Sequence, residues 1–571
     1  MYKNNTISKI IKTKIELIIP LLHFLLTFIM ERSVFQFSHS NWDIYTAIAK
    51  NQYISTQSES ILVYFVSKLF AGIFIILFWK LVFSIIKKRI DKSIFCIFSL
   101  IFIAGLFAGI FLYPSSFGLE IDNYANYAYA VRFLPTYWHS VYTGALYAGC
   151  MMFFPHPLSI FFIQWLSFVI MVAYIFNGIE KNYLKSNIKY FSLLLFVLPE
   201  SYFIVFNPYR NNFYTILCLY YFSYLIFAKH NNTEMNIKNV LYFSLLSAFI
   251  MVFRSEGILI GLGGIFYMLL FVYKISLKRI SIVVLSFFIC FFTLSNIQNI
   301  GSKKYYGQDY MLINTTSVLY SILNDPNANF SYEGANQDLA DIESIVPVQV
   351  LKELGQDGFR KYNWTAGRKA INQTLADDHT ADKYMRAYYS IILHNIDDYI
   401  DIQINSFYNA LGITADSTNH PTYFYEGPLT VDLQDFVIDD WQIGANDLNS
   451  SFFTSSWENN SLRILGYKAI VGVLSIWREL WTNSGINTIL HASAIILDCI
   501  ILIYQAVQLL TNKRIQFMKY IIFELMLLGG FASILLFMPA GRAAYLYPML
   551  YCSYLTSFLY FIEHRTRKES L

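Results

Sequence analysis

Long apolar runs separated by short polar loops fill most of the chain. About twelve of these runs have the length of roughly 17 to 25 residues that one helix needs to cross a hydrocarbon core. The pattern therefore predicts an all-α polytopic membrane protein with about 12 transmembrane helices. The runs cover residues 14–30, 60–86, 94–113, 157–176, 189–206, 213–229, 238–253, 257–273, 280–298, 485–509, 517–537 and 543–562.

One long polar stretch, residues 299–484, interrupts the apolar pattern. It holds 23 Asp and Glu residues against 12 Lys and Arg residues. Helical spacing of Leu, Tyr and Ile predicts several helices over 346–411, whereas Gly, Pro and aromatic residues in 412–444 predict loop with short strands. We expect a mainly helical extracytoplasmic domain here, between transmembrane regions 1–298 and 485–571.

The basic residues predict the orientation of the chain. Lys and Arg gather at both termini and in the short loops 87–92, 180–189, 228–238, 273–279 and 511–519. Such loops face the cytoplasm in membrane proteins. Both termini are therefore predicted to be cytoplasmic, and loop 114–156 and stretch 299–484 to face outward. No small-residue cleavage site follows the first apolar run, so we expect that run to be retained as a span.

Composition narrows the class of protein. Of the 571 residues, 56% are hydrophobic and only 14% are charged, which excludes an ordinary soluble domain. The formal net charge is +4, and its basic residues are dispersed, which argues against nucleic acid as a partner. The six cysteines are scattered, so neither a disulfide framework nor a metal motif is indicated.

Several polar side chains fall on the outward face under this topology. Charges at membrane depth are costly, so they are expected to pair with one another or to line a polar cavity. Simpler roles also remain open: a tight-turn ion pair between Arg254 and Glu256, a snorkelling Arg542 and an ordinary interfacial His139. The set comprises Glu120, Asp122, Arg132, His139, Arg210, Arg254, Glu256, His394, Asp397, Asp398 and Arg542.

External arginines together with a carboxylate suggest an anionic substrate near the membrane surface. The arginine fork suits phosphate oxygens. A carboxylate can act as general base on an acceptor hydroxyl. A sugar linked to a lipid phosphate would need both groups, because its phosphate leaves while the base prepares the nucleophile. The combination fits glycosyl transfer at a membrane surface.

Four short segments resemble the GT-C superfamily of integral-membrane glycosyltransferases. They are the acidic stretch "GLEIDNYANY", "HSVYTGALYAG", "HNIDDYIDIQ" and "GRAAYLYP", accompanied by "FRSEGIL" at the start of a span. The resemblance implies an inverting enzyme that takes sugars from polyprenyl-phosphate carriers. It maps the family's catalytic acid of the first external loop onto Asp122, with Glu120 as a second candidate. It also implies a multi-pass protein of the bacterial plasma membrane.

The resulting hypothesis assigns a role to each candidate. Asp122 is the general base, and Glu120 or His139 orients a hydroxyl. Arg254, Arg542 and Arg210 hold the donor phosphate, whereas Glu256, His394 and Asp398 contact the acceptor or have structural roles. A divalent Mg or Mn ion between Glu120 and Asp122 would suit their oxygen ligands. The expected partners are a polyprenyl-phosphate-linked sugar donor, a cell-envelope glycan or lipid acceptor, and membrane lipids.

Three alternatives stay open at this point. The chain could be an O-antigen-type polymerase or ligase, although such enzymes are expected to use arginines in two large external loops. It could also be a transporter or flippase, which would predict repeats and mid-span charges. No repeat is found in the sequence. Charged residues near the middle of a predicted span are few, and Asp498 and Glu524 are the exceptions. Finally, if residues 14–86 belong to the family core, loop 31–60 with Glu31, Asp43 and Glu59 becomes the rival source of the catalytic acid.

Overall fold

The structure is a computed structural model of the 571-residue chain. Every regular element among the residues that it describes is helical, which confirms the predicted all-α class for them. It describes residues 2–35, 57–87, 92–113, 126–127, 130–131, 133, 140–183, 187–198, 201, 207–230, 235–273, 276–302, 315–316, 318–353, 378–413, 460–482, 485–513, 517–537 and 543–569.

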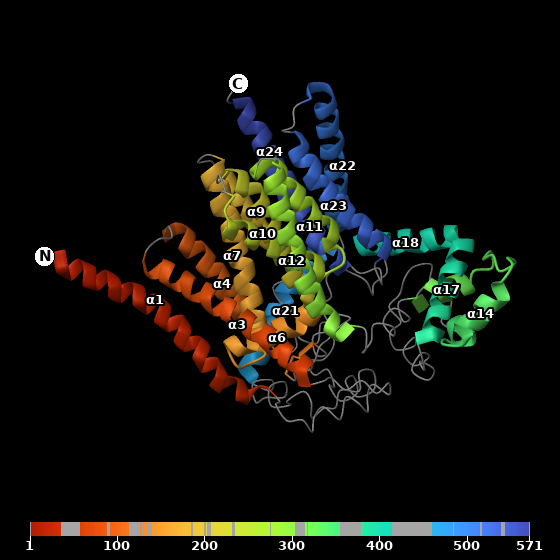
Figure 1. The fold of residues 1–571 in the computed structure, drawn as a ribbon, viewed down its shortest axis with the longest axis horizontal. Helices are drawn as coiled ribbons and strands as arrows, with labels where there is room; N and C mark the ends of the chain where they lie inside the picture. The colour runs from red at the N-terminus through yellow and green to blue at the C-terminus, as the bar shows by residue number, and fades with distance from the viewer. Residues whose placement is uncertain are drawn as a thin grey trace.

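The bundle is built largely from the N-terminal part of the chain (Figure 1). α3 packs on α6, α7 packs on α9, and α10 packs on both α11 and α12. These elements are α1 (Tyr2–Met30), η1 (Glu31–Ser33), α3 (Gln57–Ile86), α4 (Lys92–Leu112), α6 (Val141–Phe153), α7 (Leu158–Asn182), η4 (Asn187–Phe196), α9 (Arg210–His230), α10 (Ile237–Phe253), α11 (Gly257–Tyr267), η5 (Met268–Val272) and α12 (Leu277–Ser302).

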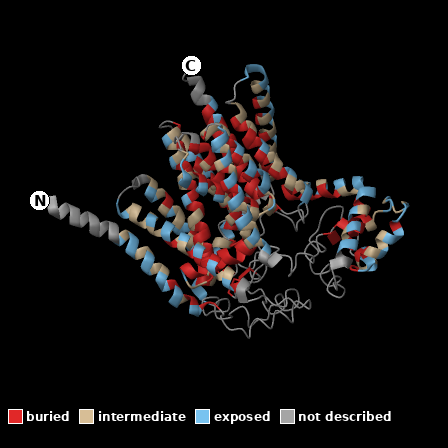
Figure 2. Cartoon of the chain, in the orientation of Figure 1, coloured by how far each residue is buried: buried red, intermediate tan, exposed pale blue. Residues whose placement is uncertain are grey.

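The C-terminal helices complete this bundle. α22 packs on α23 and α24, and α24 also packs on α9, so the end of the chain returns to its middle. Figure 2 shows buried residues concentrated where these helices meet, and exposed residues along α1 on the periphery. The elements are α21 (Ser461–Thr482), α22 (Ile486–Asn512), α23 (Met518–Phe537), η7 (Ala543–Tyr545) and α24 (Tyr547–Glu569).

Six helices within the described ranges are long and apolar enough to cross a membrane, which indicates a membrane protein. The expected number of about 12 spans is not confirmed. Expected run 189–206 begins as the 3₁₀ helix η4, which ends at Phe196, and runs 238–253 and 257–273 form shorter apolar helices. The six spans are Ser60–Ile86, Ile94–Leu112, Leu158–Asn182, Leu277–Asn299, Thr488–Asn512 and Met518–Phe537.

The polar stretch 299–484 contributes helices to two places. α14 (Ala335–Glu343) packs on α15 (Val348–Glu353) and on α17 (Asp378–His394), away from the bundle in Figure 1. α18 (Ile396–Leu411) leads back and contacts α23 and η7. α21 instead lies against α4, where the Arg463 Nε atom donates to the carbonyl of Tyr113 at 2.7 Å. The expected helices within 346–411 are thus present where the structure describes them, and the strands expected in 414–444 lie outside the described residues.

In the described part of loop 114–156, residues 141–153 form helix α6. All 13 of its residues are buried, so it packs inside the bundle. Ser140 caps its start and donates to the side-chain oxygen of Gln298 on α12 at 2.7 Å. The same oxygen accepts the backbone N–H of Val141 at 3.0 Å. Helix α12 therefore fixes where α6 begins.

Candidate functional site

Six of the eleven polar candidates lie among the described residues. Glu120, Asp122, Arg132, His139 and Arg542 fall outside the described residues. The described candidates are Arg210, Arg254, Glu256, His394, Asp397 and Asp398.

The turn between α10 and α11 carries the first part of the site. Arg254 is the C-cap of α10 and has an extended backbone, and Glu256 is the N-cap of α11. The two side chains form a forked ion pair: Arg254 Nη2 lies 2.6 Å from Glu256 Oε1, and Arg254 Nε lies 3.1 Å from Glu256 Oε2. Both side chains are largely buried, at 7% and 16% exposure. The ion pair between Arg254 and Glu256 that the sequence left open is therefore present in this turn.

The start of α9 contacts the Arg254 guanidinium at the nitrogen that Glu256 leaves free. Its third nitrogen, Nη1, donates to Asn211 Oδ1, and Asn211 is fully buried. The rings of Tyr214 and Tyr545 each lie with their centroid 5.6 Å from the guanidinium carbon, within reach of a cation–π interaction. Three elements that are distant in sequence, α9, the α10–α11 turn and η7, thus meet at one arginine.

The segment beside Arg542 belongs to this meeting point. Ala544 in η7 accepts a hydrogen bond from Asn211 Nδ2 at 3.3 Å through its carbonyl oxygen. η7 also contacts α18 and thereby joins the site to the helices of stretch 299–484. Arg210, the first residue of α9, is near enough to act electrostatically on Glu256. The structure thus brings Arg210, Arg254 and Glu256 together, beside the chain segment that follows Arg542.

Charge and burial oppose one another at the Arg254–Glu256 pair. Burial favours the neutral form of Arg254, but the charge and hydrogen bonds of Glu256 outweigh it and raise the pKa of Arg254. Burial likewise favours the neutral acid of Glu256, yet Arg254, with a contribution from Arg210, holds the pKa of that carboxyl below its ordinary value. Both groups are therefore charged at neutral pH.

Glycine at position 257 lets the turn close. A Cβ atom there would lie 2.2 Å from the Ile250 carbonyl oxygen and 2.7 Å from the Tyr214 hydroxyl. Both distances are far below van der Waals contact, and the closer atom belongs to the backbone of α10, which cannot move alone. Gly257 therefore allows α11 to start directly against α10, which sets the position of Arg254 and Glu256.

The polar segment before α9 is packed inside the bundle. Asn207, Asn211 and Asn212 are all fully buried. The Asn207 carbonyl accepts Gln164 Nε2 at 2.8 Å and Asn212 Nδ2 at 2.5 Å, so α7 and α9 both hold it. Its charge made Arg210 a candidate from the sequence, whereas the three buried asparagines were not predicted. The run "FNPYRNN", with three amides between two apolar stretches, was the available signal.

His394 and the neighbouring acids lie elsewhere, where α17 meets α18. The His394 ring stacks on Tyr332 with centroids 3.7 Å apart and planes 3° apart, and its Nδ1 atom lies 2.8 Å from the Ser390 carbonyl oxygen. Tyr332 in turn donates to Asp338 at 2.8 Å. These contacts connect α14 to α17 and give His394 a packing role in the structure.

Asp398 lies in the first turn of α18. Partial burial, followed by the negative charges of Asp325, Asp401 and Asp397, raises the pKa of its carboxyl above the ordinary value of 3.8. The neighbours that act on it are therefore acids rather than the arginines of the α10–α11 turn.

Glu31, one rival for the catalytic acid, already has two partners. It is buried at 6% exposure, forms an ion pair with Lys68 on α3 and accepts the Tyr64 hydroxyl at 3.0 Å. Lys68 also donates to Thr27 at 2.8 Å and lies 3.9 Å from the centroid of the Phe28 ring. This network attaches the end of α1 to α3. The other rivals, Asp43 and Glu59, are not placed: Asp43 is outside the described residues, and the side chain of Glu59 is not described.

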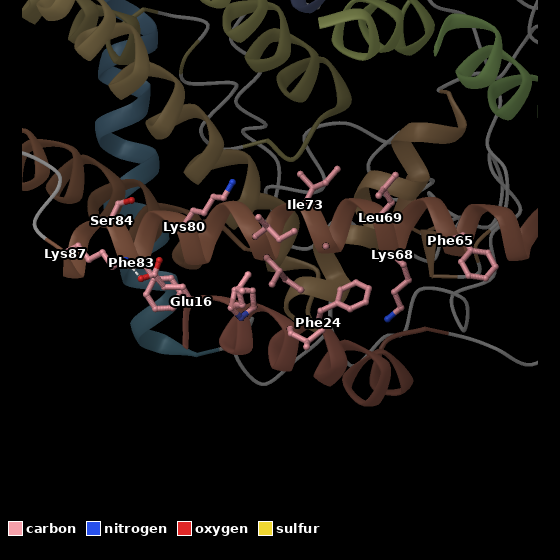
Figure 3. A pocket seen from close by; sticks show the side chains of 16 residues that line it. Glu16, Phe24, Phe65, Lys68, Leu69, Ile73, Lys80, Phe83, Ser84 and Lys87 are labelled. Atoms are coloured by element: carbon pink, nitrogen blue, oxygen red, sulfur yellow. Dashed lines mark ion pairs between the residues drawn. The ribbon is translucent and has the colours of Figure 1, made fainter. Parts of the chain in front are cut away.

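A separate groove of about 1030 Å³ runs between α1 and α3. Figure 3 shows Lys68 pointing across it toward α1, and Lys87 paired with Glu16 near its other end. Its walls are mainly apolar, with Phe24 on α1 facing α3. We refer to Arg210, Asn211, Arg254 and Glu256 together with η7 as the Arg254 site. None of the residues that line the groove belongs to it. At the Arg254 site, by contrast, charged side chains of α9 and of the α10–α11 turn meet beside η7.

No group of three or more His, Cys, Asp and Glu side chains in the described ranges is placed to hold a metal ion. The predicted Glu120–Asp122 ion site lies outside those ranges. Comparison of the chain with protein-family models, curated proteins and solved structures finds no match.

Proposed function

We propose that this protein is an inverting membrane glycosyltransferase of the GT-C type. It moves a sugar from a polyprenyl-phosphate donor to a cell-envelope glycan or lipid acceptor on the extracytoplasmic face of the bacterial plasma membrane. The observation that carries the proposal is the meeting of α9, the α10–α11 turn and η7 at Arg254. Arg210 and Arg254 thereby lie close to the segment that directly follows Arg542.

The arrangement of hydrogen bonds suits a rigid phosphate contact. Arginine has five N–H donors, and Glu256 and Asn211 occupy three of those on Arg254. The remaining donors keep a fixed direction because the guanidinium plane is held on two sides. Such preorganised donors stabilise charge that develops on a leaving group. In this proposal they face the phosphate that leaves the anomeric carbon.

The net charge of the site comes from other residues. Arg254 and Glu256 together are neutral, so this pair provides direction but little attraction for an anion. Arg210 lies close enough to act on Glu256, and Arg542 directly precedes η7 in sequence. We assign the net positive charge that attracts the donor phosphate to these two arginines.

The reaction needs one base and one leaving group. Asp122 takes the proton of the acceptor hydroxyl, whose oxygen forms a bond to the anomeric carbon. The bond between that carbon and the phosphate oxygen breaks on the opposite face, and the phosphate leaves with the electron pair. The product therefore has the inverted anomeric configuration. Glu120 or His139 orients the acceptor hydroxyl.

Purified protein incubated with a panel of labelled polyprenyl-phosphate sugars tests the proposal. We expect turnover of one donor, with Asp122→Asn lowering the rate by about 10²- to 10⁴-fold, the usual contribution of a general base. Asp341→Asn, which changes a half-buried acid on α14, is the matched control and should keep full activity. Full activity of a well-inserted Asp122→Asn variant would remove Asp122 as the base, and turnover of none of the donors would remove the proposed reaction.

A further inference from the structure

Two acids lie deep inside the C-terminal helices, away from the Arg254 site. Asp498 on α22 and Glu524 on α23 are both fully buried, and both belong to helices long and apolar enough to cross a membrane. Their carboxyl groups are close enough to interact electrostatically. Within the described ranges neither forms an ion pair with a lysine, arginine or histidine.

The hydrogen bonds around the pair are incomplete. Ser553 on α24 donates to Asp498 Oδ2. Asp498 Oδ1 and both oxygens of Glu524 are buried without a hydrogen-bond partner among the described residues. Buried carboxyl oxygens are costly when unpaired. A proton or another positive charge between the two carboxyl groups would therefore satisfy oxygens that the described protein groups do not.

A threonine hydroxyl on the third helix provides independent support. Gly530 faces Met549, and the Tyr520 ring contacts the Tyr560 ring, so the antiparallel register of α23 and α24 places Thr556 level with Glu524. The Thr556 hydroxyl is buried and has no hydrogen-bond partner within the described structure. Several helical hydroxyls in the bundle, such as that of Thr215, donate to the carbonyl four residues earlier, and that of Thr556 does not. The Thr556 hydroxyl is thus available to the carboxyl pair.

We propose that Asp498 and Glu524 form a membrane-embedded proton-binding site, in which one proton is shared between the two carboxyl groups. Two carboxylates this close, in a medium of low dielectric constant and without a cation, cannot both be ionised. One bound proton turns a repulsive pair into a hydrogen-bonded pair and satisfies oxygens that otherwise have no partner. The geometry also leaves Thr556 as a donor to the remaining charge.

Within the described ranges, the titratable groups that interact electrostatically with the pair offer no competing positive charge. They are the thiols of Cys499 on α22 and Cys552 on α24, which interact electrostatically with Glu524 and Asp498 respectively. The nearest described lysine on α23, Lys519, is paired with Glu563 of α24. A proton is therefore the simplest species that can neutralise the pair.

Polar side chains connect the pair to one end of the bundle. Ser553, Thr556, Tyr560 and Glu563 follow one another along one face of α24 at helical spacing. Tyr560 accepts a hydrogen bond from Gln505 Nε2 on α22 at 3.0 Å, one turn from the Lys519–Glu563 ion pair. This line ends beside the basic loop 511–519, which we assign as the side from which the proton enters.

Infrared spectroscopy of the full-length protein in lipid nanodiscs tests the site. We expect the carbonyl-stretch band of a protonated carboxyl at neutral pH, which weakens in both Glu524→Gln and Asp498→Asn. Glu16→Gln, which removes a carboxyl paired with Lys87 at the periphery, should leave the band unchanged. Absence of the band in the wild-type protein, or no effect of either variant, would overturn the proposal.

A second measurement needs no variant. A membrane-permeant carbodiimide adds the O–H of a protonated carboxyl across its C=N bond and leaves an acyl adduct that mass spectrometry can locate. We expect labelling of Asp498 or Glu524 that falls about tenfold per pH unit once the pair deprotonates. Labelling elsewhere only, or protection by sodium ions at constant pH, would overturn the assignment of a proton as the ligand. Either outcome is independent of whether sugar transfer is observed.

Discussion

Glu256 holds Arg254 through two nitrogens, at 2.6 Å and 3.1 Å, while Asn211 binds the third. A lysine at position 254 has one nitrogen and cannot make this forked contact. In the proposed function the fixed guanidinium stabilises the leaving phosphate. Arg254→Lys should therefore lower kcat/KM for sugar transfer by about 10- to 100-fold. This decrease corresponds to the loss of one charged hydrogen bond, roughly 1.5–3 kcal/mol.

The matched control for this prediction is Arg279→Lys. Arg279 also donates a guanidinium hydrogen bond, in this case to the backbone carbonyl of Tyr273, but it lies in the first turn of α12. Steady-state kinetics of both variants with the same donor should separate them. Equal activity of the two variants would show that the α10–α11 turn has only a structural role.

The Glu31–Lys68 pair predicts a stability effect instead of a catalytic one. Lys68→Met leaves a buried carboxylate without its cation and should destabilise the protein by about 3–5 kcal/mol. The double variant Lys68→Met/Glu31→Gln should recover much of that loss, because no charge is then left buried. Thermal unfolding in detergent measures both. Glu31→Gln alone should retain sugar transfer, and its loss in a stable variant would move the catalytic acid to the loop that begins at Glu31.

The stacked pair of His394 and Tyr332 should stabilise the packing of α14 on α17. Replacing the ring in His394→Leu removes the stacking contact, which is expected to cost about 0.5–1.5 kcal/mol. Hydrogen exchange over residues 318–353 should accelerate, whereas His394→Phe should restore most of the protection. If His394→Leu abolishes transfer without changing hydrogen exchange, His394 instead contacts the substrate.

The acidic cluster at the start of α18 predicts a pH dependence. A raised pKa of Asp398 means that the folded state binds its proton more tightly than the unfolded state does. The stabilisation is therefore fully present below pH 3.8 and is lost as the pH rises through the folded-state pKa. Above that range the ionised carboxylate repels its neighbours, and this repulsion together with burial outweighs the favourable helix dipole.

Asp398→Asn should accordingly stabilise α18 at pH 7 by about 0.2–0.5 kcal/mol, a small effect because the group is only partly buried and is screened by solvent. The difference from the wild-type protein should vanish near pH 3. Opening free energies from hydrogen exchange over 396–411 provide the measurement. A destabilised variant at pH 7 would show that the helix dipole is the larger effect.

The Arg254–Glu256 pair was accessible from sequence because both residues interrupt two apolar runs and are only two positions apart. Its partner Asn211 was not, since 43 residues separate it from Arg254 and only the packing of α9 against the α10–α11 turn brings them together. Helical periodicity predicted α17 and α18 within 346–411. Hydropathy alone could not distinguish a continuous span from the short 3₁₀ helix η4, and it placed α21 outside the bundle although Arg463 reaches Tyr113.

The crowding at Gly257 limits how the chain can vary over evolution. Even alanine would put its methyl carbon 2.2 Å from a backbone oxygen of α10, so a lineage can change this residue only by moving α11 as well. Such a shift would displace Glu256 from Arg254 in the same step. A glycine directly after Arg-x-Glu is therefore the feature by which distant homologues of this turn could be recognised, even where the surrounding apolar residues have been exchanged for one another.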